Sequence, residues 1–281
     1  MKKLVMILVI LGFTAPSLAA TVGGPDISIP EESLLSKREA VKKTLDRYDY
    51  NITAIKASVE AEFVPKRELA SAAEATSVKL EGKSYMVKFS GNFKDIVEPY
   101  IKIGTAKFEV QWAQNNRNVT IETQNGFGWG AGVKANIFEL KDYGIRLTLD
   151  TQYRNFDMDV DKKLIGSETG ETSDATSEIF EMKEWQISLL GSKRIILPIG
   201  WKDYYLVPYA GLTYSRLDVD ASFTKRTDGA LYSTYNASDE NPVGVVFGCD
   251  IMPSLLSWYL LNFEVRLVTE TGFSLGGTVK F

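Results

Sequence analysis

The stretch that decides the fold is Gly126-Phe127-Gly128-Trp129-Gly130-Ala131-Gly132-Val133-Lys134-Ala135-Asn136-Ile137. One set of alternate positions is apolar or aromatic, and the other set holds glycine, lysine and asparagine. A period of two is typical of a β-strand with one apolar and one polar face. Because a bulky residue fills every gap between the glycines and no helix follows, the nucleotide-binding fingerprints do not fit. The stretch therefore predicts an amphipathic strand of about the length that crosses a bilayer.

The same alternation recurs along the chain in nine further segments of roughly ten residues. An even number of strands with both termini on one side is the rule for bacterial barrels. We therefore predict an all-β protein, a closed antiparallel transmembrane β-barrel of about ten strands, with eight strands as the alternative. The further segments are 55–63, 84–93, 100–112, 145–154, 184–189, 206–223, 243–251, 261–267 and 273–281.

Two features of the segments set their expected arrangement. The alternation changes parity near Thr105 and near Ser215, and we expect a β-bulge near Thr105. Short links at 94–99, 139–144 and 253–258 are expected on the periplasmic side. Longer polar links are expected as outer loops. These longer links lie at 64–77, 113–125, 160–179 and 224–241.

Aromatic residues gather at both ends of the predicted strands, as expected for girdles at two membrane interfaces. The periplasmic girdle is Tyr143, Trp201, Tyr204, Tyr205, Trp258, Tyr259 and Phe281, and the outer one is Trp112, Trp129, Tyr153 and Trp185. The opposite face carries charges of both signs, which favours pairing across a narrow lumen over a selective pore. A small water channel is the alternative. The predicted lumen charges are Lys56, Lys88, Lys134, Arg146, Arg154, Arg266 and Lys280 with Glu60, Glu62, Asp150, Glu184, Asp250 and Glu264.

The first residues predict export. Lys2 and Lys3 precede an apolar run at 4–13, and Ser17-Leu18-Ala19-Ala20 offers small residues for cleavage, as in a secretory signal peptide. We expect a signal peptide at 1–20, a periplasmic N-terminal segment at 21–50 and the barrel at 51–281. Within the second part, 31–48 has roughly helical spacing, and it is interpreted as a periplasmic helix, a lumen plug or a poorly ordered tail.

Composition argues against several function classes. The chain of 281 residues has a formal net charge of −4, so it lacks the basic excess that nucleic-acid binding requires. It contains no histidine and one cysteine, Cys249, which removes the commonest general base and metal ligand. The run from Asp157 to Glu168 echoes a calcium loop, but Lys162 stands where that loop needs glycine. We expect no catalytic residue, no cofactor-binding residue, no metal ligand and no enzymatic activity.

The C-terminal Gly276-Gly277-Thr278-Val279-Lys280-Phe281 resembles the terminal signal of Gram-negative outer-membrane proteins. Together with Val207-Pro208-Tyr209-Ala210-Gly211-Leu212 it is similar to the small OmpA-type and opacity-protein-type barrels. This resemblance implies a location in the outer membrane of the cell envelope, insertion by the barrel assembly machinery, and contact with outer-membrane lipids and lipopolysaccharide. We expect a structural or surface-interaction role, with a small porin-like channel as the alternative. The oligomeric state stays open.

Overall fold

The computed structural model describes residues 23–30, 34, 52–71, 76–114, 117–165, 175–199, 202–225, 231–239, 242–254, 257–267 and 270–281. The predicted signal peptide and, apart from Leu34, the helix-like stretch 31–48 lie outside these residues. Within the described residues, the chain forms thirteen antiparallel strands and one short 3₁₀ helix. They are β1(Ile52–Ser71), β2(Thr76–Phe93), β3(Val97–Gln114), β4(Arg117–Thr123), β5(Gly126–Leu140), η1(Lys141–Tyr143), β6(Ile145–Ile165), β7(Ala175–Lys193), β8(Ile195–Ile199), β9(Lys202–Lys225), β10(Leu231–Asp239), β11(Val243–Met252), β12(Tyr259–Leu267) and β13(Glu270–Lys280).

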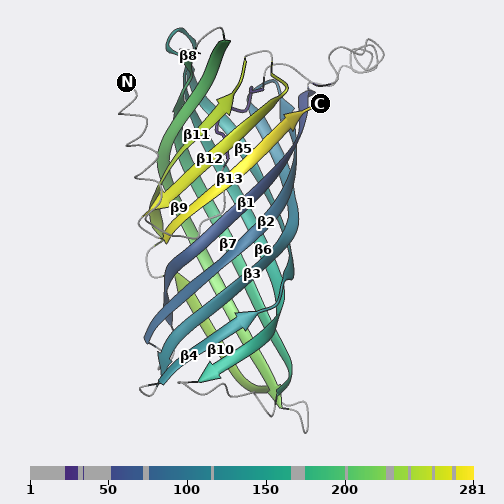
Figure 1. Ribbon diagram of the computed structural model, residues 1–281, viewed down its shortest axis with the longest axis vertical. Coiled ribbons are helices and arrows are strands. Elements are labelled where there is room, and N and C mark those ends of the chain that lie inside the picture. The colour runs from purple at the N-terminus through teal and green to yellow at the C-terminus, as the bar shows by residue number, and fades with distance from the viewer. Residues whose placement is uncertain are drawn as a thin grey trace.

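Ten strands close a ring at one end of the molecule, at the top of Figure 1. Going around it, the order is β1, β2, β3, β5, β6, β7, β9, β11, β12 and β13, and β13 pairs with β1. Each of these strands contains one of the ten segments found by alternation. The predicted closed antiparallel barrel of about ten strands is therefore confirmed.

A second, narrower ring of eight strands continues the barrel at the other end. There β4 takes the place of β5 between β3 and β6. On the opposite side β10 pairs with both β9 and β1, so it takes the place of β11, β12 and β13. We call the ten-stranded end, which holds Asp95, Tyr143 and Phe281, the proximal end, and the eight-stranded end the distal end. β4 and β10 lie at the bottom of Figure 1.

Local chemistry makes the proximal turns short. Lys94 and Asp95 both adopt positive φ, 54° and 57°, between β2 and β3. Two consecutive positive φ values suit the right-handed twist of a tight hairpin. The side chain of Asn92 holds this turn, since its Oδ1 accepts from the amide of Asp95 at 3.0 Å. The link after β7 carries the small strand β8, which pairs with the start of β9.

The expected bulge near Thr105 is absent from the pairing of β3 with β2, which runs without a shift from Lys79↔Gln111 to Ser90↔Tyr100. Side chains keep their parity along β3, but the interior positions change from Lys102 to the apolar Phe108 and Val110. The same holds in β9, whose pairing with β7 is regular around Ser215. The prediction of a bulge near Thr105 was wrong. The apolar residues do change from one face of the strand to the other, but the strand itself continues without interruption.

Much of the chain predicted as long outer loops is strand for the same reason. The range 64–77 holds the end of β1 and the start of β2, and 113–125 holds β4. The range 224–241 holds β10. In the described parts of β1, β2 and β4 at this end, apolar residues such as Leu69, Leu80 and Ile121 point inward. A search for a lipid-facing apolar stripe therefore misses such segments and interprets them as polar links.

Candidate functional site: the barrel interior

The interior is filled by three successive layers: a chain segment at the proximal end, charged side chains in the middle and apolar side chains at the distal end. The interior contains all thirteen charges predicted for the lumen, most of them in the middle layer. Eleven of them are buried, and Arg146 and Lys280 are partly buried. The interior position of these charges follows from the period of two, because every second residue of a barrel strand points inward.

Arg154 is the centre of one charge cluster. Its guanidinium contacts Glu62 at 2.6 Å through Nη1 and Glu184 at 2.9 Å through Nε. Arg266 contacts the other oxygen of Glu62 at 2.7 Å, and Arg67 contacts Glu184 at 3.1 Å. Both carboxylates therefore hold two arginines each, and the cluster crosses the lumen between β1, β6, β7 and β12.

A second cluster is built on lysines. Glu60 accepts from Lys88 at 3.0 Å and from Lys102 at 2.9 Å. Both ammonium groups lie 5.4 Å from the ring centre of Tyr100, within the range of a cation–π contact. The hydroxyl of Tyr100 donates to Asp150 at 2.8 Å. Any arrangement that separates one member of this buried set from its partners leaves an uncompensated charge, which is unfavourable. The cluster therefore holds its partners in the one arrangement that pairs them.

Several charged partners of these residues were not predicted from the sequence. Lys102 and Glu98 follow the alternation of β3, so extending that segment by two residues and including its inward positions would have found them. Arg67 lies beyond a register shift between Phe63 and Lys66, which resets the alternation. Asp26 lies in a segment whose apolar and polar residues follow neither the strand nor the helix period.

The proximal layer is the segment Gly23–Pro30, which we call the lumen segment (purple in Figure 1). The amide of Gly23 donates to Glu264 at 3.1 Å, and Leu34 beyond the segment donates to the carbonyl of Lys280 at 2.9 Å. The sequence predicted a periplasmic segment at 21–50, with a lumen plug considered only for 31–48, and did not predict that 23–30 lies inside the barrel.

Asp26 fixes the lumen segment at the proximal mouth. Its carboxylate accepts from Arg194 Nε at 2.6 Å and also pairs with Arg146. Burial raises the pKa of Asp26, but the hydrogen bond and charge of Arg194, together with the charge of Arg146, outweigh burial and hold that pKa below its ordinary value. Asp26 is therefore ionised at neutral pH.

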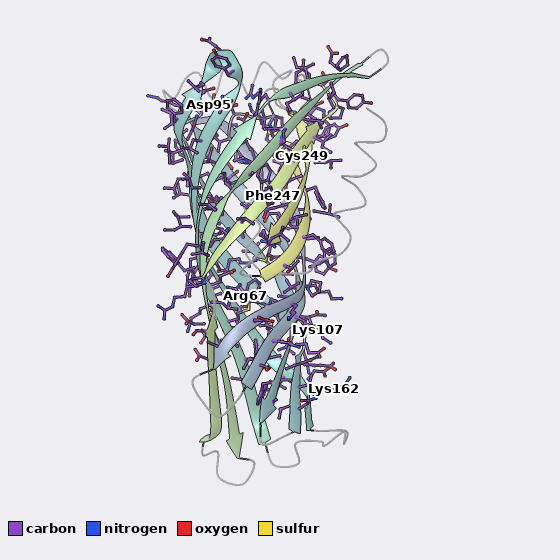
Figure 2. The ribbon with its side chains drawn as sticks, turned by 90° about the vertical axis from the view of Figure 1, so that its left-hand side faces the viewer. Arg67, Asp95, Lys107, Lys162, Phe247 and Cys249 are labelled. Carbon is purple, nitrogen blue, oxygen red and sulfur yellow. The ribbon has the colours of Figure 1, made fainter. Side chains whose placement is uncertain are left out.

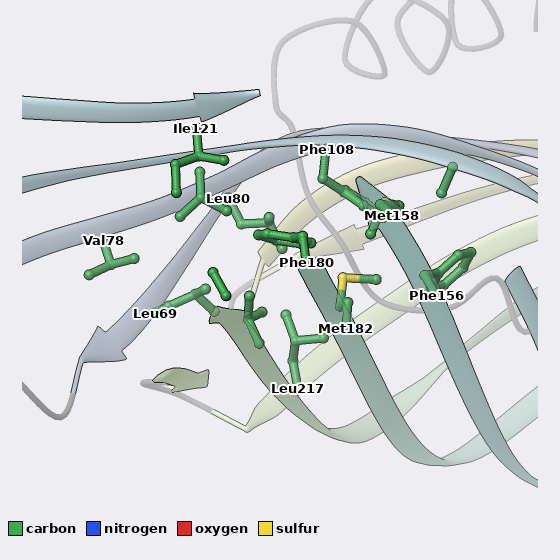
Figure 3. Packing of buried hydrophobic residues seen from close by; sticks show 14 of the residues in the cluster. Leu69, Val78, Leu80, Phe108, Ile121, Phe156, Met158, Phe180, Met182 and Leu217 are labelled. Atoms are coloured by element: carbon green, nitrogen blue, oxygen red, sulfur yellow. The ribbon is translucent and has the colours of Figure 1, made fainter. Parts of the chain in front are cut away.

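The distal layer is an apolar cluster enclosed by the eight-stranded ring (Figure 3). Phe108 and Phe156 meet edge to face with ring centres 5.7 Å apart, and Phe180 packs in the same cluster. Trp112 belongs here too, buried at 6% exposure, so its assignment to the outer aromatic girdle was wrong. A packed apolar interior is what a soluble barrel has.

The exterior also changes where the charged middle layer gives way to the apolar distal layer. There the outer surface changes from apolar to charged, opposite to the change inside. The proximal exterior is apolar, as along β6 from Ile145 to Tyr153, which matches the 9–11 residues of a membrane-crossing strand. Further along, the exterior of the distal half presents charged side chains such as Lys107 and Lys162 (Figure 2). The described large hydrophobic residues that are exposed on the barrel all lie in the proximal part.

Aromatic pairs mark the level of this change. Trp129 lies 5.6 Å from Tyr153, and Trp185 lies 6.0 Å from Tyr214, measured between ring centres. Phe63 stacks on Phe273 at 5.0 Å. At the proximal end Tyr143, Trp258, Tyr259 and Phe281 are exposed, whereas Trp201 lies outside the described residues. The exterior thus has an apolar belt with aromatic rings at both edges.

The described side chains include no group of three or more His, Cys, Asp and Glu placed to hold a metal ion. Within the same ranges, no helix is both long and apolar enough to cross a membrane.

No protein-family model matches the chain, and no curated protein matches it. Among solved structures, the translocator domain of the autotransporter NalP from Neisseria meningitidis has a TM-score of 0.41 and 13% identity, covering 86% of this chain and 92% of that one. The transport unit of the autotransporter AIDA-I from Escherichia coli has a TM-score of 0.41 and 8% identity, covering 86% and 96%. An outer membrane channel from Pseudomonas putida F1 has a TM-score of 0.31 and 9% identity, covering 83% and 98%. All three come from bacteria, and values this low carry no conclusion about what this chain binds or transports.

Proposed function

We propose that the protein is an integral outer-membrane β-barrel of the Gram-negative cell envelope. In this proposal it transports no solute and holds its distal loops above the lipid surface for contact with other molecules. The observation that carries the proposal is the double reversal of polarity. The proximal barrel is apolar outside and charged inside, as a barrel in lipid must be, and the distal barrel is charged outside and apolar inside, as a barrel in water must be.

The length of the distal section supports the surface role. From Asn155 to Ile165, β6 continues past the aromatic level for eleven residues, which are ten residue-to-residue steps. At about 3.3 Å per residue and a tilt of about 40°, this raises the distal loops by roughly 25 Å. Loops raised in this way stand clear of the lipid head groups and are free to act as a contact surface.

The filled lumen supports a non-conducting role over the porin-like alternative. An ion crossing the barrel would meet the lumen segment, then the paired charges around Arg154 and Glu60, then the apolar cluster around Phe108. The apolar layer alone is a strong barrier, because it offers no polar group to replace the hydration of an ion. No catalytic residue is part of the proposal.

The partners follow from the proposed location. Outer-membrane lipids would cover the apolar belt and lipopolysaccharide would surround the outer edge, after insertion by the barrel assembly machinery. The similarity of the C-terminal residues to OmpA-type and opacity-type barrels is part of this proposal, although ten membrane-level strands set this chain apart from their usual eight.

Two measurements test the proposal. The mature protein, refolded in detergent and added to planar bilayers, is expected to produce no unitary current steps, and regular steps would favour the porin-like channel. A peptide tag placed in 166–174, between β6 and β7, is expected to bind antibody on intact cells. Binding only after the outer membrane is opened would contradict the proposed orientation.

A further inference from the structure

The lumen segment Gly23–Pro30 lies in the barrel as a ligand and not as a strand. Within the described residues, no main-chain hydrogen bond joins it to a β-strand; its one internal main-chain bond runs from Ile29 to the carbonyl of Asp26 at 3.3 Å. Its contacts with the barrel come from side chains instead. Residues 31–51 separate it from β1 in the sequence.

Four side chains of the barrel donate to three main-chain carbonyls of the segment. Lys134 donates to the carbonyl of Gly24 at 2.8 Å, and Thr148 donates to that of Pro25 at 3.0 Å. The carbonyl of Ile27 accepts from Lys56 at 2.6 Å and from Asn92 at 2.8 Å. Lys134, Thr148, Lys56 and Asn92 are all buried, so these donors form a built site for an extended peptide backbone.

Three positions of the segment are recognised by their side chains. Asp26 is held by two arginines, as described above. Ile29 is 1% exposed and packs on the apolar residues Val207, Met252 and Leu260. At Gly24 a Cβ atom would stand 2.1 Å from Asp250 Oδ2, so a side chain fits there only if that buried carboxylate moves.

Asp250 adds an independent sign of a ligand site. It is fully buried, its Oδ1 accepts from Asn262 at 2.7 Å, and its Oδ2 has no hydrogen-bond partner among the described residues. That free oxygen points to the main chain at Gly24. A small cavity lies beside it, lined in part by Ser58, Glu98 and Thr278.

From these contacts we propose that the proximal lumen is a peptide-binding site, occupied by the protein's own N-terminal segment and open to exchange with a peptide in trans. Its ligand is an extended peptide with the pattern Gly-Pro-Asp-x-Ser-Ile. The Gly is selected by Asp250, the Asp by Arg146 and Arg194, and the Ile by the apolar pocket. Because the cis segment is covalently attached to the barrel, it has an advantage over any free peptide, so a free competitor acts only when the segment is released or cut. This site goes beyond the proposed function, which concerns the distal end.

The test uses the full chain folded first and cut afterwards. A protease site is inserted within 35–50, the barrel is folded in detergent, and cleavage then separates the lumen segment from an intact barrel. A fluorescent peptide Gly-Gly-Pro-Asp-Ile-Ser-Ile-Pro is added, and its binding is followed by anisotropy. Saturable binding to the cut barrel, with much weaker binding to the uncut one, is the expected result.

Peptide and barrel variants make the test specific. An Asp26→Ala peptide is expected to bind about 30-fold more weakly or worse, since it leaves two arginines without their carboxylate. Arg194→Gln in the barrel is expected to weaken the unmodified peptide but to change the Asp26→Ala peptide much less, as coupled partners do. Arg216→Gln, on the distal exterior, is the matched control and is expected to change neither.

Three results would overturn the inference. They are the absence of peptide binding to a cut barrel that still shows heat-modifiable gel migration, equal binding of a scrambled peptide, and a cut segment that never exchanges. The last would mean a permanent structural plug. Because the assay is done in detergent and reads neither conductance nor cell location, its failure is distinguishable from failure of the proposed function.

Discussion

Three arginine substitutions along β3 test the reversal of polarity directly. Ile101 is 56% exposed in the middle of the apolar belt, whereas Gln111 lies on the same exterior face of the distal section. Val110, next to Gln111, is 5% exposed and packs inside the distal ring. If lipid covers the proximal exterior and water the distal one, the three positions should respond in three different ways.

The expected magnitudes follow from where each side chain lies. Ile101→Arg places a charge near the middle of the bilayer and should cost about 2–4 kcal/mol of folding free energy. Gln111→Arg stays in water and should cost less than about 0.5 kcal/mol. Val110→Arg loses a buried apolar side chain and leaves an unpaired charge in an apolar cluster, which should cost about 3–5 kcal/mol although the site is outside the lipid.

The assay is reversible urea unfolding in phospholipid vesicles, followed by tryptophan fluorescence and by the gel shift on heating. A cost of several kcal/mol for Gln111→Arg together with tolerance of Val110→Arg would refute the assignment of inside and outside in the distal section. A neutral Ile101→Arg would refute the lipid contact of the belt.

Three further predictions concern the interior. Arg154→Met leaves two buried carboxylates without their shared partner and should lower the free energy of unfolding by about 3–5 kcal/mol in urea titrations. Lys183→Met, at an exposed pair, should leave the free energy of unfolding almost unchanged. Because the folded pKa of Asp26 lies below the value of about 3.9 for a free aspartate, its stabilisation is fully present above that value and lost as pH falls through the folded pKa. Protease digestion of the N-terminal segment should therefore accelerate progressively as the pH is lowered below the pKa of a free aspartate, and an Asp26→Asn variant should lose this dependence. Phe108→Ala should cost about 3–5 kcal/mol by leaving a cavity in the distal cluster, to be measured as a lowered urea midpoint with an unchanged slope.

The sequence predicted the proximal barrel well because one physical rule governs all of it. Wherever lipid lies outside and charges lie inside, the period of two has a constant sense, as at Trp129 and Lys134 in β5. The ten segments, the antiparallel order and the thirteen lumen charges follow from that rule. Whether each side chain points inward or outward can be predicted without knowing its distant partner.

The distal barrel and the lumen segment were not predictable by the same rule. Near Phe108 the interior changes from charged to apolar and the exterior from apolar to charged, so the apolar face changes side and resembles a bulge in the sequence. The position of Asp26 depends on Arg194, 168 residues later in the chain, and no local pattern encodes that contact. When the position of a side chain depends on one distant partner, it can be identified only from the three-dimensional structure.

The lumen segment also imposes an order on biogenesis. Its contacts come from Lys56 in β1, Lys134 in β5, Thr148 in β6 and Glu264 in β12, which together span almost the whole barrel sequence. This pocket does not exist until the last hairpin has joined the first strand. Residues 23–30 are thus among the first to be synthesised and the last to reach their final position. β1 must pair with β13 before the lumen segment, which precedes β1 in the sequence, can bind inside the barrel.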